Sequence, residues 1–132
     1  MGLFRKKEKI PDGIRVVYYE GELPGFSCNY ACQLLLTNDE LYITKIKPYV
    51  EVRLARERIL SMDILPEIEY MKKFKGNAPT QSSNKVYYVL NYLDKIGNKK
   101  HMDFWGTTFE DHKMRRLQQE LLSDSQSHTY EI

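Results

Sequence analysis

The stretch YACQLLLTNDELYITKI, residues 30–46, predicts a β-hairpin. In its first half, Cys32, Leu34 and Leu36 occupy every second position and so share one face of a strand. The pair Asn38-Asp39 is typical of a tight turn, because short polar side chains hydrogen-bond to their own backbone there. We therefore expect strands at residues 30–37 and 41–46, joined by this turn.

Similar patterns extend the predicted sheet in both directions. Stretches rich in Val, Ile, Leu and Tyr predict further strands at residues 14–20, 50–54, 59–65, 86–93 and 99–105. Because Pro66 interrupts one of them, residues 67–74 are expected as a sixth strand piece or as a bent continuation of the fifth. Residues 21–29 and 75–84 are expected as loops, since they carry Pro, Gly, Ser and Asn.

The hydrophobic period changes from two to 3.6 near the C-terminus, which predicts one amphipathic helix at about residues 108–122. Thr107 followed three positions later by Glu110 matches a capping box, with Thr107 as N-cap. We expect the segment from Phe109 to Leu122 to close the open end of the sheet. The apolar positions at helical spacing are Met114, Leu117 and Leu121.

The chain has 132 residues, which favours one domain. We expect a basic tail at residues 1–13, a folded domain at 14–122 and a flexible polar tail at 123–132. The predicted fold is mainly β: a partly open antiparallel barrel of about seven strands, capped by one C-terminal α-helix. Neither an apolar run of eighteen residues nor a signal-peptide pattern occurs in the sequence, so a cytoplasmic protein is expected.

The positive charge is concentrated in the tail. Lys and Arg number 20 against 18 Asp and Glu, giving a net charge of +2. Residues 1–10 alone carry +3, which leaves −1 on residues 11–132. Because nucleic-acid affinity rests on clustered cations that neutralise phosphates, we do not expect a nucleic-acid partner, although a small barrel that binds single strands is the alternative function.

Three stretches carry a family resemblance: residues 34–43 (LLLTNDELYI), residues 59–64 (ILSMDI), and Phe104-Trp105 before the helix. Over residues 14–122 the chain resembles the pleckstrin-homology-like superfold, in its bacterial PH-like or GRAM-like branch. The resemblance implies a capped, partly open barrel that binds lipid headgroups, phosphopeptides or peptides, or that serves as an assembly scaffold. Phosphoinositide-binding members cluster cations in the first hairpin loop, whereas residues 21–27 contain one Glu and no Lys or Arg.

Two groups of residues are candidate contact sites. The tail combines two apolar residues with four cations and is a candidate for weak contact with an anionic membrane at its inner face, alongside its simpler interpretation as a solvated start. Its residues are Leu3, Phe4, Arg5, Lys6, Lys7 and Lys9. A second cluster precedes the loop at 75–84 and is a candidate site for a ligand or partner, or else a lysine-protected edge strand. Its residues are Lys72, Lys73, Phe74 and Lys75.

Residues with catalytic or metal-binding chemistry form no established motif. His101 and Asp103 fall on one strand face and could pair as a base with an orienting carboxylate, but no nucleophile accompanies them and a solvent-facing pair is expected. Cys28 and Cys32 lack the further ligands that zinc needs, and a buried free thiol is expected at Cys32. The sequence therefore predicts a non-catalytic adaptor or scaffold without cofactor, metal or small-molecule substrate, which binds a protein partner, itself or an anionic membrane surface.

Overall fold

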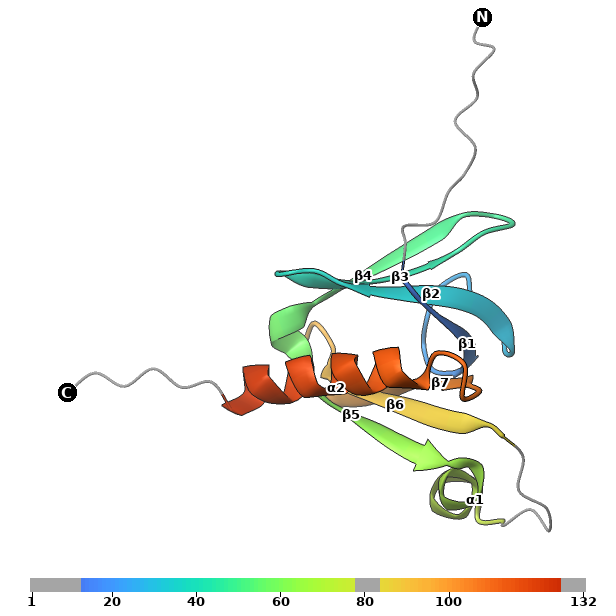
Figure 1. Ribbon diagram of the computed structural model, residues 1–132. Coiled ribbons are helices and arrows are strands. Elements are labelled where there is room, and N and C mark those ends of the chain that lie inside the picture. The colour runs from blue at the N-terminus through green and yellow to red at the C-terminus, as the bar shows by residue number, and fades with distance from the viewer. Residues whose placement is uncertain (1–12, 78–83, 127–132) are drawn as a thin grey trace, which may run out of the picture.

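The computed structural model describes residues 13–77 and 84–126, and its strands form one antiparallel sheet (Figure 1). The sheet has seven strands in the order β4-β3-β2-β1-β7-β6-β5. Because the outer strands β4 and β5 do not pair with each other, the sheet is not closed. The strands are β1 (Ile14–Glu20), β2 (Tyr30–Leu36), β3 (Glu40–Lys45), β4 (Val50–Ala55), β5 (Ile59–Pro66), β6 (Val86–Leu93) and β7 (Lys99–Gly106). The prediction of a mainly β, partly open sheet with a C-terminal helix is confirmed.

The β2–β3 hairpin forms as the sequence predicts. Leu34 lies opposite Ile43, and Leu36 lies opposite Leu41. In the turn, the Thr37 hydroxyl donates to the Glu40 carbonyl at 3.0 Å and accepts the Glu40 N–H at 3.1 Å. These side-chain bonds fix the turn and hold the register in which the apolar residues of both strands face the core.

The main core lies between the inner faces of the two halves of the sheet. It contains residues of every strand, and those of β2, β3, β6 and β7 are almost fully buried. The C-terminal helix, α2 (Asp111–Gln126), adds Met114, Leu117 and Leu121 to this core. Each buried side chain of this size stabilises the fold by roughly 1.5–3 kcal/mol. Gln118 also donates to the Met62 carbonyl of β5 at 2.9 Å, so α2 is held against the strand at one open edge.

The expected start of α2 is wrong by three residues. Thr107 is not its N-cap, because residues 107–110 form a turn in which the Asp111 N–H bonds to the Thr108 carbonyl at 3.4 Å. Asp111 begins the helix, since its carboxylate binds the Tyr88 hydroxyl at 2.7 Å and Arg115 at 2.7 Å. The helix also continues to Gln126, four residues into the expected tail.

The expected strand at residues 67–74 is also wrong. Pro66 ends β5, and a short helix α1 (Glu67–Tyr70) follows, with a π-helical turn η2 (Met71–Lys75) after it. Tyr70 and Phe74, four residues apart, fall on one helical face and cover the outer face of the sheet. Gly76 ends the turn with a φ of 70°, a conformation that suits glycine. One more short helical turn, η1 (Arg56–Arg58), joins β4 to β5.

A second, smaller core lies under α1 and η2, and the sequence pattern did not predict it. The rings of Tyr70 and Tyr87 stack with centroids 4.1 Å apart, and Tyr19 meets both rings edge-on. Leu65, Val89 and Trp105 complete this cluster. The sheet is therefore covered on both faces where β6 and β7 lie.

Candidate functional site

The predicted lysine cluster is divided between the surface and the second core. Phe74 packs inward, with its ring centroid 4.8 Å from that of Tyr70 and 5.1 Å from that of His101. Lys75 forms an ion pair with Glu20, and this hydrogen bond raises the pKa of Lys75. Lys72 and Lys73 are exposed. The four residues lie on a helical turn and not on an edge strand, and the three lysines are exposed whereas Phe74 packs inward.

The predicted membrane contact at Leu3, Phe4, Arg5, Lys6, Lys7 and Lys9 lies outside the described residues and stays a prediction. Among residues 13–77 and 84–126, no helix is both long enough and apolar enough to cross a bilayer.

His101 and Asp103 do form a pair, but the carboxylate is not solvent-facing as expected. His101 Nδ1 lies 2.6 Å from Asp103 Oδ1, and the Tyr70 hydroxyl donates to Asp103 Oδ2 at 2.5 Å. Asp103 has no exposed surface. Burial, followed by the bond to Asp103, raises the pKa of Tyr70 far above its usual value, so this hydroxyl remains a donor. The group ties α1 to the sheet.

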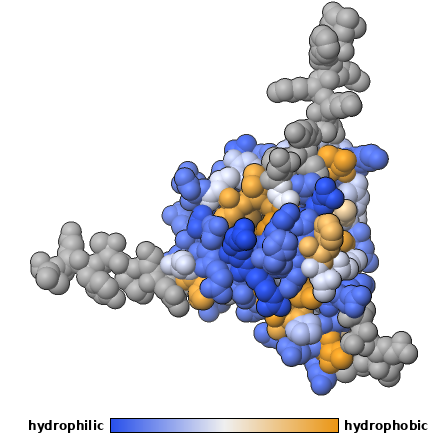
Figure 2. Space-filling model, viewed as in Figure 1, coloured by the Kyte–Doolittle hydropathy of each residue, from blue (hydrophilic) through white to orange (hydrophobic). Residues whose placement is uncertain are grey.

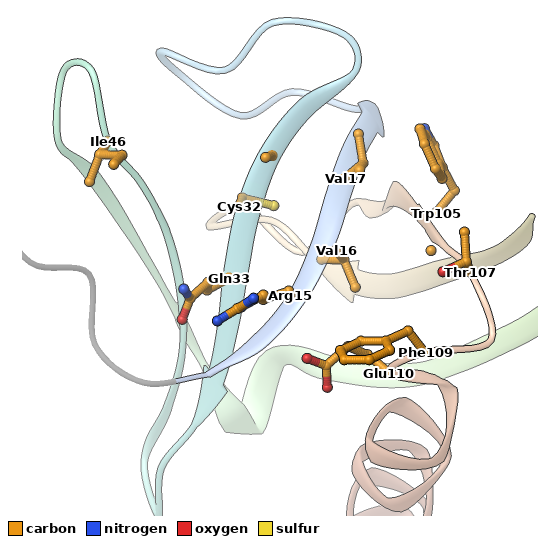
Figure 3. A pocket seen from close by; sticks show the side chains of 12 residues that line it. Arg15, Val16, Val17, Cys32, Gln33, Ile46, Trp105, Thr107, Phe109 and Glu110 are labelled. Atoms are coloured by element: carbon orange, nitrogen blue, oxygen red, sulfur yellow. The ribbon is translucent and has the colours of Figure 1, made fainter.

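A groove opens where β1 extends beyond the end of β7. The two strands pair from Val17 opposite Trp105 onward, and β7 ends at Gly106. Residues 14–16 of β1 therefore keep a strand partner only on the β2 side. The turn at residues 107–110 passes this open edge and bounds a hollow of about 420 Å³ (Figure 3).

The groove is apolar at its base and polar at its rim. Val16, Val17 and Cys32 line it from the sheet, and Trp105 closes one end. Figure 3 shows Arg15 and Gln33 side by side on the strands, with Phe109 and Glu110 at the start of α2 across the opening. Phe109 is 77% exposed, although it begins the segment that was expected to close the open end of the sheet.

The charged side chains at the rim of the groove differ in whether they form an ion pair. Glu110 pairs with Lys113 at 2.8 Å, one helical turn along α2. No carboxylate partner of Arg15 is found in the described part of the chain, and its side chain is exposed. Farther along α2, a second hollow of about 210 Å³ lies between residues 34–36 and the helix, and Arg116 borders it. The groove thus offers an apolar base next to the exposed guanidinium of Arg15.

The walls of the groove are held by contacts from several elements. The Trp105 indole N–H donates to Asn29 Oδ1 at 2.9 Å, and Asn29 has a φ of 61°, which asparagine tolerates. The Lys85 ammonium lies 4.5 Å from the Trp105 ring centroid. On the other side, the Tyr88–Asp111 hydrogen bond fixes the start of α2. Rigid walls of this kind reduce the entropy lost when a ligand binds.

The surface around α2 separates polar from apolar regions. In Figure 2 the outward face of α2 is hydrophilic, and apolar patches lie on both sides of it. Arg115, Arg116, Gln119 and Glu120 are exposed on this face. The helix therefore presents a polar face next to the groove at Phe109.

The two cysteines differ in exposure, and the expected burial of Cys32 is confirmed. Cys32 is buried and Cys28 is exposed, and both are free thiols. Burial raises the pKa of Cys32 to about 12, so its thiol is not ionised at neutral pH. In the described ranges, no three His, Cys, Asp or Glu residues come together in a way that could hold a metal ion.

No protein-family model matches the chain, and no curated protein matches it. The fold and the groove define the class only as a small antiparallel β domain with a C-terminal helix and an apolar groove beside it.

Proposed function

We propose that the chain is a non-catalytic adaptor of the PH-like or GRAM-like kind that binds a protein partner. The single observation that supports this function is the groove, with Phe109 exposed at its rim and the open edge of β1 inside it. A large exposed aromatic residue beside an apolar hollow is typical of a contact surface, since burying its ring contributes strongly to affinity.

The chemistry of the groove suits an extended peptide. The open edge at Ile14, Arg15 and Val16 offers backbone groups to a further strand, which would extend the sheet beyond β1. An apolar side chain of the peptide would occupy the base near Val17 and Trp105. Arg15 favours an acidic neighbour in that peptide, because it is exposed and without a carboxylate partner among the described residues.

Peptide display on the immobilised full chain tests this function. Selected peptides are expected to share an apolar residue next to an acidic one, and their affinity is measured by fluorescence polarisation. Phe109→Ser should weaken binding by about tenfold or more, because a buried aromatic contact is lost. The matched control is Ile96→Ser: Ile96 is 82% exposed but lies in the turn at the opposite end of β7.

The same measurements distinguish the other functions. Anionic vesicles and a labelled single-stranded oligonucleotide are titrated in parallel at low and high salt, since both contacts weaken with salt. If the chain binds only vesicles or only the oligonucleotide, or if Phe109→Ser and Ile96→Ser have equal effects on peptide affinity, the proposed function is wrong.

A further inference from the structure

The outer strand β4 has no described strand or helix paired with its free edge. At the β5 edge, α2 lies against the strand and Gln118 bonds to the Met62 carbonyl. At the other edge, β4 pairs with β3, and the described part of the chain provides no strand on its second side. An open edge of this kind can accept a strand from another molecule.

The hydrogen-bond pattern of β4 shows which residues present this edge. The Arg56 N–H bonds to the Asp39 carbonyl at 2.8 Å, and Arg56 and Asp39 continue the β3–β4 register. Bonded and non-bonded pairs alternate along an antiparallel ladder, so Val52 is also bonded to β3. The N–H and C=O groups of Glu51 and Arg53 therefore point away from β3.

The order of charges along this edge is complementary to itself. In an antiparallel pair of two β4 strands centred on Val52, each Glu51 lies opposite an Arg53 of the other copy. These are also the two residues whose backbone groups face outward, so each Glu51–Arg53 pair can exchange two backbone hydrogen bonds. The outward backbone groups and the charge pattern therefore favour the same register, which is centred on Val52.

The two charged side chains are already held in place on one face of β4. Arg53 Nε donates to Glu51 Oε2 at 2.7 Å, and the Tyr49 hydroxyl donates to Glu51 Oε1 at 2.8 Å. The Arg53 guanidinium also lies 5.1 Å from the ring centroid of Tyr42 on β3. Because these contacts restrict both side chains before association, less conformational freedom is lost when a second strand arrives.

We propose that this edge binds a second copy of the chain, and that the two copies form a two-fold symmetric dimer through antiparallel β4–β4 pairing. A two-fold interface requires a surface that complements itself, and the alternation of Glu51 and Arg53 about Val52 meets this requirement. Strands with a different charge order would place like charges opposite each other, which disfavours them as partners. The pairing is separate from the groove at Phe109, so both contacts can operate together.

Charge-reversal variants test the dimer, with the mass of the full chain measured by light scattering and sedimentation across a concentration series. Wild type is expected to be dimeric at about 100 μM. Glu51→Arg and Arg53→Glu, made singly, each place like charges opposite and should raise the dissociation constant by about tenfold or more. The double variant E51R/R53E should restore dimerisation, because it exchanges the two charges and keeps their order complementary.

Two further variants separate edge pairing from other causes. Arg53→Pro removes an outward N–H without removing a β3–β4 ladder bond, and should give a folded monomer by circular dichroism. Phe109→Ser should leave the dimer intact, which distinguishes this interface from the groove. A wild-type chain that stays monomeric at about 100 μM, or a double variant no more dimeric than the single variants, would overturn the proposal.

Discussion

The hydroxyl of Tyr70 donates to the carboxylate of Asp103 at 2.5 Å, and this carboxylate is entirely buried. Its other oxygen lies 2.6 Å from His101 Nδ1. A buried carboxylate is costly unless it is hydrogen-bonded, so the two contacts make its position on the outer face of β7 tolerable. The bond also joins α1 to the sheet across 33 residues of sequence.

Tyr70→Phe should therefore destabilise the chain although the ring remains. The substitution removes one donor from buried Asp103, and we expect the free energy of unfolding to fall by about 1–3 kcal/mol. Urea unfolding followed by circular dichroism measures this change. Tyr19→Phe is the matched control: Tyr19 packs in the same aromatic cluster, but no hydrogen bond of its hydroxyl is found among the described residues. Equal losses for the two variants would contradict this role of the hydroxyl.

The sheet was predictable because its signals are local. Alternating apolar residues and short polar turns define the β2–β3 and β6–β7 hairpins, and both form close to the expected limits. At residues 67–74 the local signal was insufficient, since a short stretch with scattered apolar residues fits a strand or a helix. The choice depends on the outer face of the sheet, where the rings of Tyr87 and Tyr19 pack against Tyr70.

The groove was not predictable in the same way. The groove depends on how far β1 extends past the end of β7 at Gly106. This offset comes from pairing between strands about 90 residues apart. The start of α2 is a similar case: the spacing of Thr107 and Glu110 suits a cap, but Tyr88 and Arg115 bind Asp111 instead. The sequence did contain one local signal for the groove: the aromatic residue at position 109 lies outside the helical stripe of Met114, Leu117 and Leu121.

Asp111 should make the stability of the chain sensitive to acid. Burial favours a higher pKa for Asp111, but hydrogen bonds from Tyr88 and Arg115 outweigh it and hold the pKa of this carboxyl below its usual value. On acidification the unfolded chain is therefore protonated first, so this contribution is present above about pH 4 and is lost as pH falls through the folded pKa. Asp111→Asn removes the group that titrates.

We expect Asp111→Asn to be less stable than wild type at pH 7, with the difference shrinking between about pH 4 and pH 2. Tyr88→Phe, which removes one of the two bonds, should show a smaller change of the same sign. Urea unfolding at a series of pH values measures both effects. A difference between wild type and Asp111→Asn that is constant across this range would contradict the assignment.

The two thiols should react at very different rates. Cys28 is exposed, whereas Cys32 is buried and its pKa is raised to about 12. Because the thiolate is the reactive form, a disulfide reagent such as Ellman's reagent should modify one thiol rapidly in the native chain at pH 8 and both in denaturant. Cys28→Ser should abolish the rapid phase, and a rapid phase that survives this substitution would show that Cys32 is accessible.

Arg56 should be needed to hold the last turns of α2. Its Nε and Nη2 bond to the two oxygens of Asp124 at 2.5 and 3.0 Å, and its Nη1 donates to the Thr37 carbonyl at 2.9 Å. A lysine carries the same charge but cannot make this planar set of bonds. Arg56→Lys should therefore lower the free energy of unfolding by about 1 kcal/mol and speed amide exchange near Asp124.

The control for this substitution lies on the same helix. Arg115 pairs with Asp111 at the exposed surface, and Arg115→Lys should change stability by less than about 0.5 kcal/mol, because exposed pairs at this spacing contribute little. Hydrogen–deuterium exchange should then place the Arg56 effect in the final turns of α2, which Arg56 of η1 joins to Thr37 in the β2–β3 turn. If Arg56→Lys instead leaves exchange near Asp124 unchanged, packing of Leu117 and Leu121 alone is enough to hold the helix.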